Sequence, residues 1–147
     1  MKLMKALELS NYIINYAIEH QKHVSNLMLQ KILYFCQISS YKNSGDRIIT
    51  DHGFEAWMFG PVCREVYVEY CLYGSEPIKG EPKISGLLVP MYIQDTINKC
   101  LNKGPWALVH YSHSKDGAWA KTYIPGLKNK IPEEYIKQEA QNGTEQI

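Results

Sequence analysis

Three side chains in the C-terminal third of the chain have the spacing of a metal site. His110, His113 and Asp116 follow one another at intervals of three residues. Side chains three apart share one face of a helix, and two imidazoles with a carboxylate can bind zinc or iron. However, Asp116 is expected beyond a helix end, and the H-E-x-x-H spacing is absent. These residues are therefore weak metal candidates, and no cofactor is expected.

A cysteine–histidine pair could supply nucleophilic catalysis, with Cys63 beside His52 or His113. Such a thiol must be activated by a base or by a lowered pKa, and no sequence feature supplies either. The chain contains no G-x-S-x-G, P-loop or G-x-G-x-x-G motif. The sequence therefore predicts that the protein is not an enzyme, and a hydrolase using His110 and His113 is a distant alternative.

The composition fits one globular domain. A chain of 147 residues, 45% of them hydrophobic, can bury a core without disulfides or metals. Its 16 basic and 15 acidic residues nearly cancel, which argues against direct nucleic-acid binding, because that requires a basic face. No apolar run approaches the roughly 20 residues needed to span a bilayer, so no membrane association is expected.

The N-terminal residues and the cysteines favour a cytoplasmic location. The sequence MKLMKALELS lacks the apolar stretch and the cleavage site of a signal peptide. None of the four cysteines forms a C-x-x-C pair, and Cys36, Cys63 and Cys100 lie among apolar residues. Buried, reduced thiols are the expected state of such cysteines in the cytoplasm.

Apolar periodicity predicts a mainly α fold of the α+β class: a compact bundle of about six or seven helices with one small β-hairpin. The expected helices are Lys5–His20, Asn26–Lys42, Val62–Cys71, a helix from Pro90 to the stop at Gly104-Pro105, Trp106–His113, Lys115–Tyr123 and Pro132–Gln141. The second of these is apolar nearly all round, which is typical of a central helix, and Ser25 is its expected N-cap. Residues 75–86 are expected to form a loop, and residues 142–147 a frayed tail.

The hairpin is expected from two short apolar runs, Arg47–Thr50 and Phe54–Phe59. Gly53 would supply the positive φ of the turn between them. Gly60 would then end the second strand, and Pro61 would take the first position of the next helix.

Lys31 lies in the middle of the predicted central helix. A lysine in that position either extends its amine to water or requires a carboxylate partner. Glu55, inside the second predicted strand, is the candidate partner if Lys31 is buried.

Two stretches together resemble the Panacea domain family: LMLQKILYFCQ at Leu27–Gln37 and FEAWMFGPVCREVY at Phe54–Tyr67. A third stretch, YSHSKDGAWAK at Tyr111–Lys121, is similar to a Thr-His pair followed by Pro-Trp in the family, with Ser112 and Ala118 replacing Thr and Pro. The C-terminal NKIPEEYIKQ resembles the family's last helix. The resemblance extends over nearly the whole chain and implies a single Panacea-like domain over residues 1–147.

The family includes phage-associated GepA-like proteins and the SocA-type proteolytic adaptor. The resemblance implies a non-enzymatic protein that binds a protein partner. This would be an antitoxin that neutralises a toxin by direct contact, or an adaptor that delivers the toxin to a ClpXP-type protease. The alternative is a phage or mobile-element accessory protein that binds a host or regulatory partner without antitoxin activity.

The positions that match the family motifs are implied to hold the fold. They are Lys31, Phe54, Glu55, Trp57, Gly60, Pro61, Val62, Tyr67, His113 and Trp119. The eleven tyrosines exceed what a core of this size needs, so some are expected on the surface, where aromatic side chains anchor protein partners.

Overall fold

The computed structural model describes residues 3–80, 88–143 and 147, and over these residues it contains seven α-helices, one short 3-10 helix and three strands. The predicted mainly helical α+β fold is confirmed. The helices are α1 (Ala6–Glu19), α2 (Asn26–Ser44), α3 (Arg64–Glu69), η1 (Cys71–Tyr73), α4 (Met91–Leu101), α5 (Pro105–Ser112), α6 (Ala118–Thr122) and α7 (Glu133–Asn142). The strands β1 (Phe54–Trp57), β2 (Gly60–Val62) and β3 (Lys130–Ile131) form an antiparallel sheet in the order β2-β1-β3.

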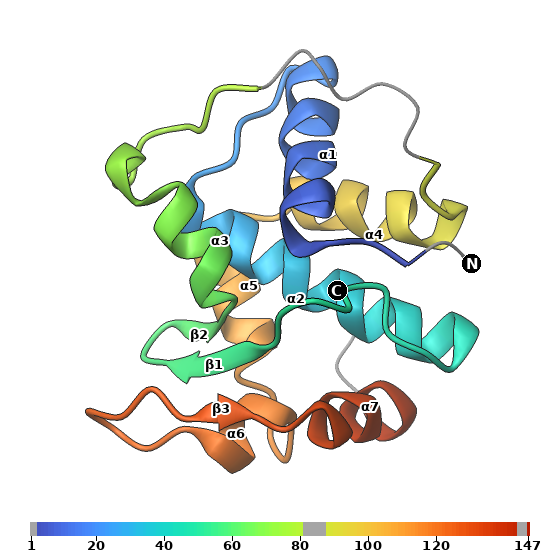
Figure 1. The fold of residues 1–147 in the computed structure, drawn as a ribbon, viewed down its shortest axis with the longest axis vertical. Coiled ribbons are helices and arrows are strands. Elements are labelled where there is room, and N and C mark those ends of the chain that lie inside the picture. Colours follow the sequence, from blue (N-terminus) through green and yellow to red (C-terminus); the bar gives the residue numbers. More distant parts are fainter. Residues whose placement is uncertain (1–2, 81–87, 144–146) are drawn as a thin grey trace.

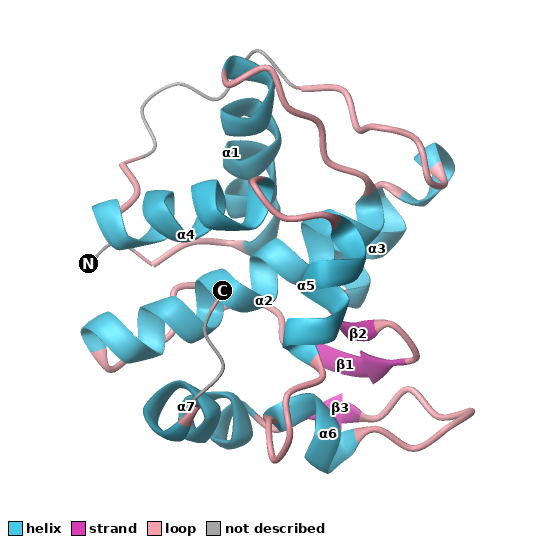
Figure 2. Cartoon of the chain, turned by 180° about the vertical axis from the view of Figure 1, so that it is seen from behind, coloured by secondary structure: helices cyan, strands magenta, loops and turns pink. Residues whose placement is uncertain are grey.

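Helix α2 forms the centre of the molecule, as its apolar residues predicted (Figure 1). It packs against α1, α3, α4, α5, α7 and β2. Helices α1 and α4 lie on one side of it, and the sheet, α6 and α7 lie on the other (Figures 1 and 2). Ser25 caps its start by accepting a hydrogen bond from the Met28 amide at 3.3 Å, and Gly45, with φ 79°, follows its end.

Buried polar side chains of α2 bond to the backbone of segments that have no regular structure of their own. The Gln37 Oε1 atom accepts hydrogen bonds from the amides of Ile48 and Ile49 at 3.2 and 2.9 Å. The Gln30 Oε1 atom accepts one from the Cys63 amide at 2.9 Å. Because buried backbone amides need partners, these glutamines fix the path of the chain before β1 and after β2.

The predicted hairpin partner is wrong. Strand β1 pairs with β2, with Trp57 opposite Gly60, and the turn is Met58-Phe59. Residues 47–50 form no strand and contribute only an isolated parallel bridge between Ile49 and Met4. The residue that turns the chain is Gly60, whose φ is 111°, and not Gly53.

The start of α3 is also later than predicted. Pro61 belongs to β2, and the helix begins at Arg64 after Cys63 as N-cap. After the Met58-Phe59 turn, residues Gly60–Val62 pair with β1, so the helix can begin only after this strand ends. Helix α6 likewise begins at Ala118 and not at Lys115, because Asp116 has a φ of 60° that a helix does not permit.

The remaining helices lie close to their predicted positions, with Pro90 and Pro132 immediately preceding α4 and α7. Of the predicted loop 75–86 and tail 142–147, residues 81–86 and 144–146 lie outside the described residues. Within the described part of the chain, no helix is both long enough and apolar enough to cross a membrane.

Candidate protein-binding site

An apolar groove of about 490 Å³ opens where the β1–β2 turn faces α5 and the loop before β3. Trp57, Phe59 and Tyr67 contribute to one wall, and Trp106 and Leu127 contribute to the other. These side chains come from segments up to 70 residues apart, counted from Trp57 to Leu127 (127 − 57). Only the fold brings them together.

Aromatic rings in the groove meet edge to face. The rings of Trp57 and Tyr67 lie 4.9 Å apart at 63°, and those of Phe59 and Trp106 lie 5.2 Å apart at 83°. Trp106 nevertheless leaves 60% of its surface exposed, and Met58 at the turn leaves 64% exposed. Exposed aromatic and apolar side chains gathered at a concave site are the usual signature of a protein-binding surface.

Lys31 contributes to the floor of this groove and has no exposed surface. Its Nζ atom donates a hydrogen bond of 2.7 Å to the carbonyl oxygen of Pro61. Burial lowers the pKa of Lys31 to about 7, because the interior disfavours the charged ammonium. Within the described part of the chain, the amine is therefore buried without a counter-charge.

The predicted Lys31–Glu55 pair is wrong. Among the described residues, no carboxylate lies within 4.0 Å of the Lys31 amine. Both Glu55 oxygens instead accept hydrogen bonds of 2.9 Å from Arg64, and Oε1 also accepts one from Trp57 Nε1. Side chains alternate along β1, so Glu55 points to the face opposite Phe54, which packs against α2.

Gly60 packs closely against Ser112 and against Lys31, which lines the groove. A Cβ atom at this position would lie 2.6 Å from Ser112 Oγ and 2.8 Å from Lys31 Cε. Both contacts are closer than any packed side chain allows, and the positive φ of Gly60 also disfavours other residues. The turn, α2 and α5 therefore approach one another closely at this glycine.

His113 and Trp119 lie directly beside this region. Their rings stack with centroids 3.6 Å apart and 7° between planes, and Trp119 Nε1 donates a 2.7 Å hydrogen bond to the Trp57 carbonyl. Burial and the neighbouring Lys31 and His110 lower the pKa of His113. Of the described buried side-chain nitrogens and oxygens, His113 Nε2 alone has no hydrogen-bond partner.

The structure thus places the third family-like stretch, Tyr111–Lys121, in contact with the second, Phe54–Tyr67. Six of the ten motif positions lie in β1 and β2, and Phe54 among them contacts the core ring of Tyr34 edge to face. Four of the ten line the groove: Lys31, Trp57, Val62 and Tyr67. Sequence reasoning missed Met58, Trp106 and Lys128. The available signal was the pair of large apolar residues Met58-Phe59 at a tight turn, because a turn lies at the surface and leaves such side chains exposed.

The weak metal candidates do not form one ligand set. His113 ends α5, and Asp116 lies in the turn beyond it, so the three-residue spacing does not continue along one helix. His110 is exposed and contacts the Tyr111 ring. The described residues contain no group of three or more His, Cys, Asp or Glu side chains that could hold a metal ion.

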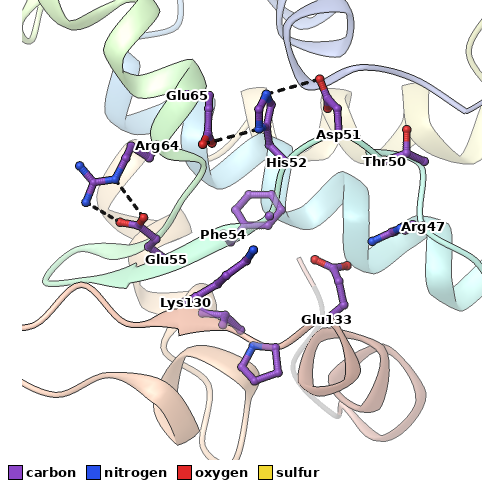
Figure 3. Close-up of a pocket in the computed structure, with 13 residues that line it drawn as sticks. Arg47, Thr50, Asp51, His52, Phe54, Glu55, Arg64, Glu65, Lys130 and Glu133 are labelled. Atoms are coloured by element: carbon purple, nitrogen blue, oxygen red, sulfur yellow. Dashed lines mark hydrogen bonds and ion pairs between the residues drawn. The ribbon is translucent and has the colours of Figure 1, made fainter.

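A second, polar cleft of about 510 Å³ is lined by the start of β1 and the residues before it, by the start of α3, and by β3 and the start of α7 (Figure 3). His52 sits between Asp51 and Glu65, with nitrogen–oxygen distances of 3.6 and 3.5 Å. Asp51 also accepts a 2.9 Å hydrogen bond from the Ala6 amide at the start of α1. Glu133, at the start of α7, accepts a 2.7 Å hydrogen bond from Tyr41.

The carboxylates of the polar cleft therefore have structural partners. Cys63 immediately precedes Arg64, which lines this cleft. Burial raises the pKa of the Cys63 thiol to about 12. Such a thiol stays protonated and is a poor nucleophile. The geometry therefore gives no support to the cysteine–histidine pair weighed from the sequence.

Comparison with known proteins found a family match over part of the chain. The family model of the antitoxin SocA-like Panacea domain matches residues 29–86, a segment that includes Lys31, β1, β2 and α3. Neither the curated proteins nor the solved structures gave a match. The match supports a toxin–antitoxin-related role in general, with a protein as partner. The resemblance predicted from the sequence motifs is thereby confirmed, and residues 29–86 are similar to the Panacea domain of SocA-like antitoxins.

Proposed function

We propose that this protein is a non-enzymatic antitoxin that neutralises a toxin by direct contact through the apolar groove. The observation that carries the proposal is the position of the antitoxin-like segment. Residues 29–86 supply the floor and one aromatic wall of the groove, including Trp57, Phe59 and Tyr67.

The groove has the properties of a preformed binding surface. The Trp57 side chain is held by the hydrogen bond that its Nε1 donates to Glu55 and by ring contact with Tyr67, so little side-chain freedom remains to be lost on binding. Trp106 packs edge to face against Phe59 and is mostly exposed. Burial of such a side chain by a partner supplies a large part of an interface's binding energy.

The test is co-expression with the product of the adjacent reading frame. The neighbour is expected to arrest growth alone, and this chain is expected to restore growth and to co-purify with it. Trp106→Ala should weaken binding by about 30-fold or more, which corresponds to about 2 kcal/mol. Leu72→Ala is the matched control, because Leu72 is 98% exposed and lies outside the groove.

A harmless neighbour, or one that stays toxic beside this chain, contradicts the antitoxin proposal and favours the accessory-protein alternative. Equal loss of binding in both variants would place the contact elsewhere. Toxin abundance in the rescued cells distinguishes the two modes of neutralisation. A stable, inhibited toxin indicates direct blockade, whereas loss of the toxin that requires a ClpXP-type protease indicates adaptor activity.

A further inference from the structure

We propose that the groove takes a toxin segment in which an aspartate or glutamate side chain lies beside a large apolar side chain. The apolar side chain occupies the aromatic walls, and the carboxylate binds between Lys128 at the rim and Lys31 beneath the floor. This inference rests on the proposed antitoxin function, because it describes the partner of that same surface.

The charges at the groove have one sign. Lys31 and Lys128 are the basic side chains that line it, and none of the lining residues is an aspartate or glutamate. Lys128 is exposed, with its amine 4.2 Å from the centre of the Trp57 ring. A carboxylate that approaches the walls of this groove therefore meets the Lys128 cation and the Lys31 amine, and no lining anion.

The nearest acid at the rim already has partners. Burial raises the pKa of the Glu55 carboxyl, but hydrogen bonds from Arg64 and Trp57, the charge of Arg64 and, least of these, the charge of Lys128 together lower it below its ordinary value. Arg64 also lies 5.6 Å from the Trp57 ring. With Glu55 held by Arg64, Lys128 leaves an excess positive charge on this side of the groove.

The floor adds a second reason for an acidic partner. An ammonium has three N–H donors, and among the described residues the Lys31 amine has one acceptor, the carbonyl of Pro61. Its neighbours are Gly60 and Ser112, with His113 near enough to be influenced by its charge. A carboxylate that covers the groove would exclude water and favour the protonated form of this amine, which it would then attract strongly through a medium of low dielectric.

The walls determine the neighbouring side chain. Trp57, Tyr67, Phe59 and Trp106 form two edge-to-face pairs, and an inserted aromatic ring or long aliphatic chain would contact both. The volume of about 490 Å³ holds a few side chains and not a whole domain. A basic segment is excluded, since desolvating its charge beside two lysines costs free energy without compensation.

The charge preference can be tested without the toxin by using three small probes of one shape. Indole-3-acetate, indole-3-acetamide and tryptamine carry the same ring with an anionic, a neutral and a cationic group. Binding to the isotope-labelled full chain is followed by NMR at the amides of β1, β2 and α5. We expect indole-3-acetate to bind about tenfold more tightly than the amide, as charge-assisted hydrogen bonds exceed neutral ones by about that factor.

Two variants test whether Lys128, at the rim of the groove, causes the preference for the anionic probe. Lys128→Gln should reduce the advantage of indole-3-acetate over the amide by several-fold. Lys121→Gln is the matched control, because Lys121 is also exposed and lies 4.8 Å from the Tyr135 ring, outside the groove. Equal or tighter binding of tryptamine, shifts that map away from the groove, or an unchanged preference in Lys128→Gln would overturn the inference.

The toxin itself separates failure of this inference from failure of the proposed function. In a complex with the co-purified neighbour, Lys128→Glu should weaken binding more than Lys128→Gln does, and Lys121→Glu should have little effect. A toxin that is neutralised equally by all three variants supports the antitoxin function and overturns the acidic-segment inference. A neighbour that does not bind the unaltered chain overturns the antitoxin function, whatever the small probes show.

Discussion

The primary amine of Lys31 is buried in the interior of the fold, where it donates a hydrogen bond to the Pro61 carbonyl. Burial lowers its pKa from 10.5 to about 7. In the interval between those values the unfolded chain binds a proton that the folded chain does not, so stability rises with pH across this interval. A shift of this size corresponds to about 5 kcal/mol, which is comparable to the whole stability of many domains.

Replacement of this amine by an apolar isostere is therefore expected to stabilise the protein. Lys31→Met removes the cost of burying a charge, of about 4 kcal/mol near neutral pH, but leaves the Pro61 carbonyl without its donor, which costs about 1–3 kcal/mol. We expect a net gain of about 2 kcal/mol near pH 7, measured by urea denaturation. The stability increase between about pH 7 and about pH 9.5 should also largely disappear in this variant.

Lys128→Met is the control for that measurement, because Lys128 is exposed and its replacement should leave the pH dependence intact. A Lys31→Met protein that is less stable than the unaltered chain near pH 7, or that keeps the full rise toward alkaline pH, would contradict the buried, uncompensated amine.

Among the elements, the β1–β2 hairpin connects the sheet to α2 and α5 at one glycine. Gly60 combines a φ of 111° with two neighbours that leave no room for a Cβ atom. Gly126 provides a comparison, because it has a φ of 83° and a Cβ atom there would meet nothing within 4 Å among the described residues. Substitution of Gly126 therefore measures the cost of backbone strain alone, and substitution of Gly60 measures strain and close packing together.

We expect Gly126→Ala to cost about 1 kcal/mol, the strain of a non-glycine residue in the left-handed region. Gly60→Ala should cost about 1–3 kcal/mol more, because Ser112 and the Lys31 side chain must also move. Chemical denaturation of both variants measures the difference. Equal losses would mean that the floor of the groove can relax around an added methyl group.

The sequence predicted the elements whose determinants are local. Helices α1 and α2 follow from apolar periodicity, and the Ser25 cap marks the start of α2. The second partner of β1 could not be predicted, since β3 has two residues, Lys130 and Ile131, and lies about 75 residues away in the chain. The role of Gln30 and Gln37 was equally hidden, because a polar residue on a helix gives no sign that it binds a distant backbone.

The sequence motifs identified several residues of the candidate site, but they did not predict that these residues line one groove. Lys31, Trp57 and Tyr67 lie in the segment similar to antitoxins, and the structure gathers them at one groove. The buried lysine was foreseen as one of two outcomes, yet its expected partner Glu55 faces away from it. A strand's alternation can be read only when its pairing is known.

At the scale of the molecule, the groove is assembled from two parts of the chain that fold on different elements. One wall lies between β1 and α3, and the other comes from α5 and the residues after α6. Both parts are joined to α2, either directly or through the Trp119–Trp57 hydrogen bond. A partner that fills the groove must therefore contact both parts at once.

Hydrogen–deuterium exchange of the toxin complex tests that expectation. Binding should protect amides in residues 57–62, in α5 and in residues 123–128 together, since all three border the groove. Helix α4 packs on the opposite side of α2 and should keep its exchange rates. Protection centred on α4, or on only one wall, would require a different binding surface.

The side chains at the rim of the groove are exposed, so they can contribute to partner binding while contributing little to the stability of the fold. Met58, Trp106 and Leu127 leave 64%, 60% and 50% of their surfaces in water, so replacing them removes little from the core. The buried glycine, lysine and stacked histidine below them stay unchanged when the rim is altered. If the groove binds the toxin as proposed, redesign of a few rim side chains is expected to re-target the scaffold to a toxin of different shape at almost no loss of stability.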